Sequence, residues 1–99
     1  MLTDIRDFLK THIKNAGDDF LYDDEDWYGK YIHWQTSTHT DGVLRTYIVR
    51  FYGDKKADGK YLVRLQINRD IFWVGYPSMK FCSSVEEFKQ IFEEFLQTV

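Results

Sequence analysis

Three consecutive stretches of alternating apolar and polar residues constrain the fold of this chain most strongly. They cover Val43–Tyr52, Lys60–Asn68 and Ile71–Tyr76, and each is rich in β-branched and aromatic residues. A period of two residues with this composition is typical of a β-strand that buries one face. Because short turn-forming segments separate the stretches, we predict three consecutive antiparallel strands.

A fourth strand is predicted ahead of these three, over Tyr31–Thr38. It is followed by the pair Asp41-Gly42, which is among the strongest two-residue signals for a β-hairpin. Pro77, the only proline, should end the last strand because it has no N–H group to donate to a sheet.

Helices are predicted at both ends of the chain. Thr3–Ala16 places apolar residues at helical spacing, with Thr3 as the expected N-cap. Ser84–Val99 carries a continuous apolar stripe, and Ser84 with Glu87 has the spacing of a capping box. We therefore predict one α+β domain over residues 1–99 with the order α-β-β-β-β-α. It is a two-layer fold, a four-stranded antiparallel meander whose N- and C-terminal helices pack on one face.

Tight turns also predict how the strands pair. We expect Tyr31 opposite Tyr52, Tyr52 opposite Lys60, and Asn68 opposite Ile71. One face of the sheet then becomes almost wholly apolar, and both helices can cover it. No predicted element remains for the other face, called here the open face, which carries Tyr31, His33, Ile48, Arg50, Tyr52, Leu62, Arg64 and Trp73.

Aromatic residues beside arginine on an uncovered face are typical of the centre of an interface. The open face would then contact a partner, or a second copy of the chain in a homodimer. The alternative is a solvated face whose cross-strand aromatic pairs only stabilise the sheet.

Charge is distributed unevenly along the chain, which carries a net −3. Residues 1–29 hold eight acidic and three basic residues, whereas residues 30–80 hold four acidic and nine basic ones. This balance argues against a strongly basic nucleic-acid-binding protein. The single cysteine excludes an internal disulfide, and the charged N-terminus resembles neither a signal peptide nor a membrane anchor, so we expect a cytoplasmic protein.

An acidic and aromatic segment at residues 18–28 is predicted to connect the first helix to the sheet. Its acids should be solvated, and they repel one another unless a partner benefits from them. We therefore treat the segment as the sharper candidate binding site, with the alternative that its acids only balance the basic sheet. The candidate residues are Asp18, Asp19, Asp23, Asp24, Glu25, Asp26, Trp27 and Tyr28.

No pattern in the sequence supports catalysis, a cofactor or a metal. Cys82 precedes a predicted helix, but no histidine is near it in the sequence. His33 and His39 are too far apart along one predicted strand to form a metal site with Asp41. We expect no enzyme, no cofactor and no bound metal.

The sequence therefore favours a small, acidic, non-enzymatic protein-binding module. We expect an inhibitor or immunity-type protein, of the kind that phages and bacteria encode against defence proteins, which docks on the basic surface of a partner protein. The alternative is the binding of single-stranded nucleic acid on the open face, where Tyr31, Tyr52 and Trp73 would stack with bases. No membrane partner is expected.

Overall fold

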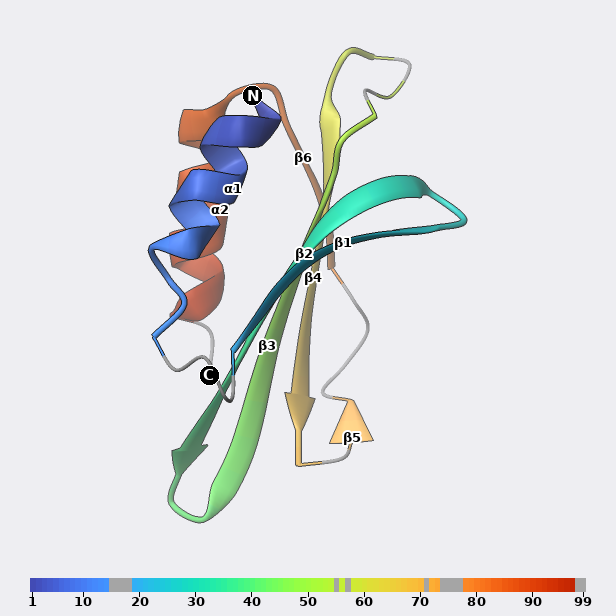
Figure 1. Ribbon diagram of the computed structural model, residues 1–99. Helices are drawn as coiled ribbons and strands as arrows, with labels where there is room; N and C mark the ends of the chain where they lie inside the picture. Colours follow the sequence, from blue (N-terminus) through green and yellow to red (C-terminus); the bar gives the residue numbers. More distant parts are fainter. Residues whose placement is uncertain (15–18, 55, 57, 71, 74–77, 98–99) are drawn as a thin grey trace.

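The computed structural model describes residues 1–14, 19–54, 56, 58–70, 72–73 and 78–97. Two helices lie side by side against one face of an antiparallel sheet (Figure 1). The elements are α1 (Leu2–Lys10), β1 (Phe20–Asp26), β2 (Gly29–Thr40), β3 (Val43–Tyr52), β4 (Tyr61–Arg69), β5 (Phe72–Trp73), β6 (Ser78–Cys82) and α2 (Val85–Leu96).

The α+β class and the antiparallel meander are confirmed, but the sheet is five strands wide rather than four. The strands follow the order β1-β2-β3-β4, and β5 and β6 pair with successive parts of β4. Two strands were not predicted. The first is β1, which occupies the segment expected to be a connector, and the second is β6, which follows Pro77. Of the predicted strand Ile71–Tyr76, only Phe72–Trp73 lies within the described residues.

The hairpin of β2 and β3 agrees closely with the prediction. β3 has the predicted bounds, and Tyr31 pairs with Tyr52. Asp41 and Gly42 have φ angles of 54° and 76°, so both central residues of the turn are in the left-handed region, as a type I′ hairpin turn requires.

The predicted register of β4 was wrong by two residues. Phe51 pairs with Val63, so the ladder does not place Tyr52 opposite Lys60. The next turn is displaced as well, because Asp70 adopts a left-handed conformation and bonds to Leu44. The Asp70 N–H donates to the Leu44 carbonyl at 2.6 Å, and the Leu44 N–H donates to the Asp70 carboxylate at 3.1 Å. Since a shift by two residues leaves every side chain on its own face, the predicted assignment of residues to the two faces remains correct.

The helices differ from the prediction mainly in length. α1 begins at Leu2 and ends at Lys10, well before Ala16, and its N-cap is Met1 without a side-chain cap. In α2, the predicted N-cap is confirmed because the Ser84 hydroxyl accepts a hydrogen bond from the Glu87 N–H at 3.1 Å. The Glu87 carboxylate accepts from the Ser83 hydroxyl instead of closing the predicted capping box.

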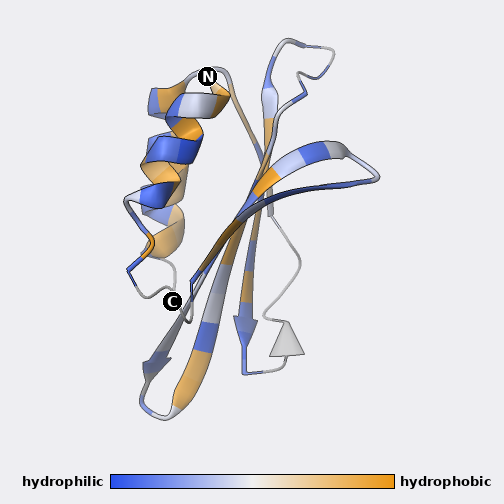
Figure 2. Cartoon of the chain, in the orientation of Figure 1, coloured by the Kyte–Doolittle hydropathy of each residue, from blue (hydrophilic) through white to orange (hydrophobic). Residues whose placement is uncertain are grey.

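The main core fills the space between the helices and the sheet. Apolar residues alternate with polar ones along both helices (Figure 2), and Phe88 and Phe92 of α2 are fully buried. Phe92 contacts Trp34 and Phe8 at ring-centroid distances of 4.8 Å and 5.3 Å. Of the residues predicted for the helix-covered face, Tyr61 and Ile67 are partly buried against this core. The buried ones are Ile32, Trp34, Tyr47, Val49, Phe51, Val63 and Leu65.

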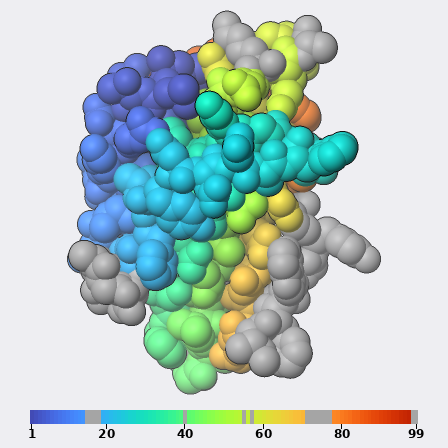
Figure 3. Space-filling model, turned by 45° about the vertical axis from the view of Figure 1, so that its right-hand side comes forward, coloured from blue at the N-terminus to red at the C-terminus, as the bar shows by residue number. Residues whose placement is uncertain are grey.

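A second, smaller cluster is buried on the opposite face of the sheet. It consists of Tyr31, Tyr52 and Leu62, of which Tyr52 is completely buried. No helix covers this face in the described residues. Instead, the hairpin of β1 and β2 lies across the neighbouring strands (Figure 3). The position of that hairpin determines which residues of the two candidate sites reach the surface.

Candidate interaction surface

The acidic segment is the edge strand β1, and its side chains point alternately to the two faces of the sheet. Asp23 lies opposite Ile32 on the helix-covered side, where its carboxylate binds the Arg6 guanidinium at 2.6 Å. Asp24 lies opposite Tyr31 on the other side. Both residues are exposed, as expected, although alternation along the strand gives these neighbouring acids different surroundings.

Asp19 contradicts the expectation that the acids of this segment are solvated. Only 7% of the residue is exposed, and its carboxylate accepts hydrogen bonds from the Thr36 hydroxyl at 2.7 Å and from the Lys14 N–H at 2.8 Å. These bonds tie the start of β1 to β2 and to the segment after α1. Asp18 lies outside the described residues.

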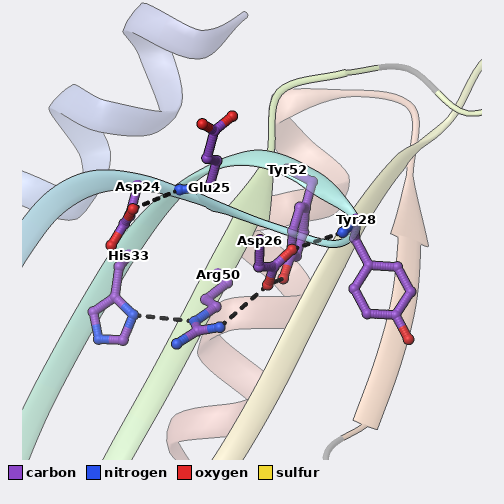
Figure 4. A network of polar contacts seen from close by, with 7 residues as sticks. All are labelled: Asp24, Glu25, Asp26, Tyr28, His33, Arg50 and Tyr52. Carbon is purple, nitrogen blue, oxygen red and sulfur yellow. Dashed lines mark hydrogen bonds and ion pairs between the residues drawn. The ribbon is translucent and has the colours of Figure 1, made fainter.

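Asp26, the last residue of β1, is the centre of a polar network on the face opposite the helices (Figure 4). Its Oδ2 accepts a hydrogen bond from the Tyr52 hydroxyl at 2.6 Å and forms an ion pair with Arg50 at 3.3 Å. Its Oδ1 accepts from the Tyr28 N–H at 2.8 Å, which fixes the turn that follows β1. Asp26 therefore attaches the hairpin to β3 and is not free to bind a partner.

Opposing influences act on the ionisation of Asp26. Burial, the largest of them, raises its pKa, but the hydrogen bonds from Tyr52 and Tyr28 and the charges of Arg50 and Arg64 lower the pKa below its ordinary value. Conversely, burial and the bond to Asp26 raise the pKa of Tyr52 to about 12. Asp26 is therefore a carboxylate and Tyr52 a neutral donor at neutral pH.

His33 continues the network along β2. The Arg50 Nε–H donates to its Nδ1 at 3.3 Å, so a neutral ring carries its proton on Nε2, which lies 3.0 Å from the Gln35 side-chain oxygen. The Tyr22 ring stacks on His33 with a centroid distance of 4.5 Å. Burial, followed by the charge of Arg50, lowers the pKa of His33. His33 is therefore an uncharged part of the packing.

The open face is not open at most of its predicted positions. Tyr31, His33, Tyr52 and Leu62 are buried, and the other described members, Ile48, Arg50 and Arg64, are half-buried. The cause is β1, whose hairpin brings Tyr22 and Asp26 over residues that a four-stranded sheet would leave uncovered. Trp73 pairs with Asn68 in the ladder, and its side chain lies outside the description.

The exposed part of the acidic candidate site is concentrated near the end of the β1–β2 hairpin. Trp27 is 96% exposed at the turn, Tyr28 is 46% exposed, and Asp24 and Glu25 are exposed beside them. All four were predicted from the sequence as candidate binding residues, and their side chains are accessible. The sequence did not indicate that Tyr22, which is 44% exposed, belongs to the same surface.

A second surface was missed because it is formed by β6. Met79 and Phe81 are 42% and 50% exposed and lie opposite Arg64 and Leu62 of β4. Together with Tyr28 of the hairpin they line a groove of about 600 Å³, which also includes Leu62, Lys56 and Asp58. Figure 4 shows the Tyr28 ring directed toward β6. Recognition of β6 as a strand would have identified this surface.

Metal-binding groups do not converge in the described part of the chain. No three histidine, cysteine, aspartate or glutamate side chains there are arranged to hold a metal ion. Cys82 is fully buried, and burial, with a smaller effect of Glu87, raises the pKa of its thiol to about 11. The thiol is therefore neither accessible nor ionised at neutral pH.

Comparison of the chain with protein-family models, curated proteins and solved structures found no match. In the parts of the chain that the structure describes, neither helix has the length and apolar character needed to span a bilayer.

Proposed function

We propose that this protein is a non-enzymatic binding module whose β1–β2 hairpin docks on a basic surface of a partner protein. The observation that carries the proposal is the exposure of 96% of Trp27 at the end of a strand that also presents Asp24 and Glu25 to solvent. An exposed tryptophan buries no apolar surface on folding and so does not stabilise the fold, whereas tryptophans buried in interfaces often contribute much of the binding energy.

The hairpin is suited to this role because it is held in one position. The bonds of Asp26 to Tyr52 and Arg50 fix its end, and the ion pair between Asp23 and Arg6 fixes its other side to α1. A preorganised surface loses less conformational entropy on binding than a mobile loop does. The solvated acids would speed association with a basic partner and make it sensitive to salt.

An inhibitor or immunity-type protein is the class that best fits these features, and phages and bacteria encode many proteins of this size and character. A cytoplasmic location accords with the single cysteine. Binding of single-stranded nucleic acid is the weaker alternative, because Tyr31 and Tyr52 are buried and Arg50 is paired with Asp26. Their rings and charge are not accessible for stacking or for phosphate.

The test is affinity capture from lysate of the native host with the immobilised wild-type protein and two variants. We expect Trp27→Ser and the double variant Asp24→Lys/Glu25→Lys each to lose the partner that the wild type retains. The partner should have a basic surface and should elute as salt increases. Both variants should unfold like the wild type because the replaced side chains are exposed.

The matched control is the double variant Asp7→Lys/Glu93→Lys, which makes the same change of net charge at exposed positions on the two helices. It should retain the partner. If the hairpin variants bind as tightly as the wild type, or if the control loses binding equally, the hairpin is not the docking site.

A further inference from the structure

The two edges of the sheet differ in how they are protected from other strands. The outer edge of β1 carries the charged residues Asp23, Asp24 and Glu25, which discourage the addition of another strand. The other edge is β6, which pairs with β4 and with no other strand in the described residues. It presents Met79 and Phe81 with Lys80 as its only charge.

The groove beside β6 provides space for side chains of an added strand. Its walls are Tyr28 on the hairpin and Phe81 and Met79 on β6, and Leu62 contributes to its lining. A volume of about 600 Å³ accommodates several side chains rather than one water or ion. Because Met79 and Phe81 lie on the same face of β6, alternate side chains of a strand paired with the free edge of β6 would lie beside these two residues, at the outer side of the groove.

The charges around β6 indicate the composition of such a strand. Arg64 lies beside Met79 on the groove face, and its Nε atom is buried without a hydrogen-bond partner in the described residues. Asp26 acts on both Arg50 and Arg64 but forms an ion pair only with Arg50. Lys80 is exposed on the other face of β6. An acidic side chain beside Lys80 would therefore meet an exposed cation, whereas the groove face, with Met79 and Phe81, favours apolar side chains.

A second copy of the chain fits this edge poorly. Antiparallel pairing of two β6 strands about their middle residue would place Lys80 opposite Lys80, and like charges directly opposite destabilise a sheet. Pairing of β6 with β1 of another copy joins two different surfaces, so it does not close into a dimer.

We infer that β6 accepts an extended segment of a partner protein that carries alternating apolar and acidic side chains, which adds to the sheet as a further strand. Main-chain hydrogen bonds to β6 hold the segment, its apolar side chains pack against Met79 and Phe81 at the groove, and its acidic side chains, which point to the other face, pair with Lys80. This site has the opposite charge preference to the hairpin and does not depend on the function proposed for the hairpin.

The probe is a phage-displayed library of random linear peptides selected on the wild-type protein. We expect enrichment of peptides that alternate apolar residues with at least one acid. The strongest of them is then synthesised with blocked ends and titrated against the wild type and variants. Phe81→Ser should weaken its binding roughly 10-fold or more, because a half-exposed phenylalanine loses its contact. Lys80→Gln should also weaken binding and reduce its dependence on salt.

The control is Phe20→Ser on β1, because Phe20 is 48% exposed and lies at the opposite edge of the sheet. Phe20→Ser should bind the peptide with the affinity of the wild type. The hairpin variant Asp24→Lys/Glu25→Lys should do so too, which would show that the β6 site is distinct from the hairpin surface. Thermal unfolding of each variant checks that it is folded. Hydrogen exchange should show slower exchange of β6 amides when the peptide is bound.

Three results would overturn the inference. The first is the absence of enriched peptides, or the enrichment of basic ones. The second is unchanged affinity in Phe81→Ser, or unchanged exchange of the β6 amides in the complex. The third is a dimer in light scattering that Phe81→Ser converts to a monomer, which would assign the edge to a second copy of the chain.

Discussion

Removal of one hydroxyl group should measure how strongly the hairpin is attached to the sheet. In Tyr52→Phe the ring remains in the buried cluster with Tyr31 and Leu62, and only the donor to Asp26 is lost. Because the ring keeps its shape, the change opens no large cavity. The free energy of unfolding therefore reports the hydrogen bond itself.

The expected loss follows from the surroundings of Asp26. A hydrogen bond to a charged group contributes roughly 1.5–3 kcal/mol. Asp26 keeps its ion pair with Arg50 at 3.3 Å and its bond from the Tyr28 N–H at 2.8 Å, so we expect a value near the lower limit, about 1.5 kcal/mol. In a domain of this size that corresponds to a fall in Tm of roughly 6–12 °C.

Urea unfolding followed by tryptophan fluorescence, at pH 7 and at acid pH, is the assay. The folded-state pKa of Asp26 is lowered from 3.8, so its contribution to stability is present above that pH and is lost as the pH falls through the lowered value. The difference between Tyr52→Phe and the wild type should therefore be full at pH 7 and should shrink in strong acid. Tyr22→Phe removes a hydroxyl from a half-exposed ring and should leave stability unchanged.

A double-mutant cycle with Asp26→Ala, which removes the acceptor, tests this hydrogen bond directly. If the two side chains act through their mutual bond, the two losses should not add, and the coupling energy should be about 1.5 kcal/mol. A coupling below about 0.5 kcal/mol, within the usual error of additivity, would refute this account of how the hairpin is held.

Three further predictions concern buried groups. Phe92→Ala should lower the free energy of unfolding by about 3–5 kcal/mol in urea, because the fully buried ring contacts Trp34, and a loss below about 1 kcal/mol would contradict the packing. Cys82 should not react with a thiol reagent at about pH 8 until the protein unfolds, whereas rapid labelling of the folded protein would disprove its burial. In NMR, the His33 ring should titrate below its ordinary pKa of 6.5. Because the pKa is lowered in the folded protein, the free energy of unfolding should fall as the pH drops below 6.5. Titration at or above pH 6.5 would contradict a neutral ring.

Periodicity and turn chemistry made the centre of the sheet predictable. The alternation along β3 and the type I′ preference of Asp41-Gly42 both depend on local sequence, and they gave the correct bounds and the pairing with β2. The apolar stripe of α2 was predictable for the same reason. The turn at Asp70 was not, because its position depends on bonds to Leu44, which is distant in the sequence.

The two outer strands could not be recognised from the sequence because their composition is not typical of β-strands. Four acids in β1 suggest a solvated loop, although an edge strand also favours charge on its exposed side. β6 is only five residues long and follows Pro77, so its alternation is too short to stand out. Without β1 the sequence could not indicate that Tyr31 and Tyr52 are buried. Of the predicted candidate residues, Trp27 and Tyr28 are exposed, whereas Asp19 is buried and Asp26 is bound by Tyr52 and Arg50.

The two-residue difference in the pairing of β3 with β4 has a consequence for folding. Pairings that differ by two residues keep Val63 and Leu65 on the helix side, so burial alone discriminates weakly between them. The energy gap between these competing sheets must come from local features, namely the bonds of Asp70 to Leu44 and the left-handed Gly59 in the preceding loop. We therefore expect a chain altered at either position to form a misregistered sheet of similar hydrophobic content more often during folding.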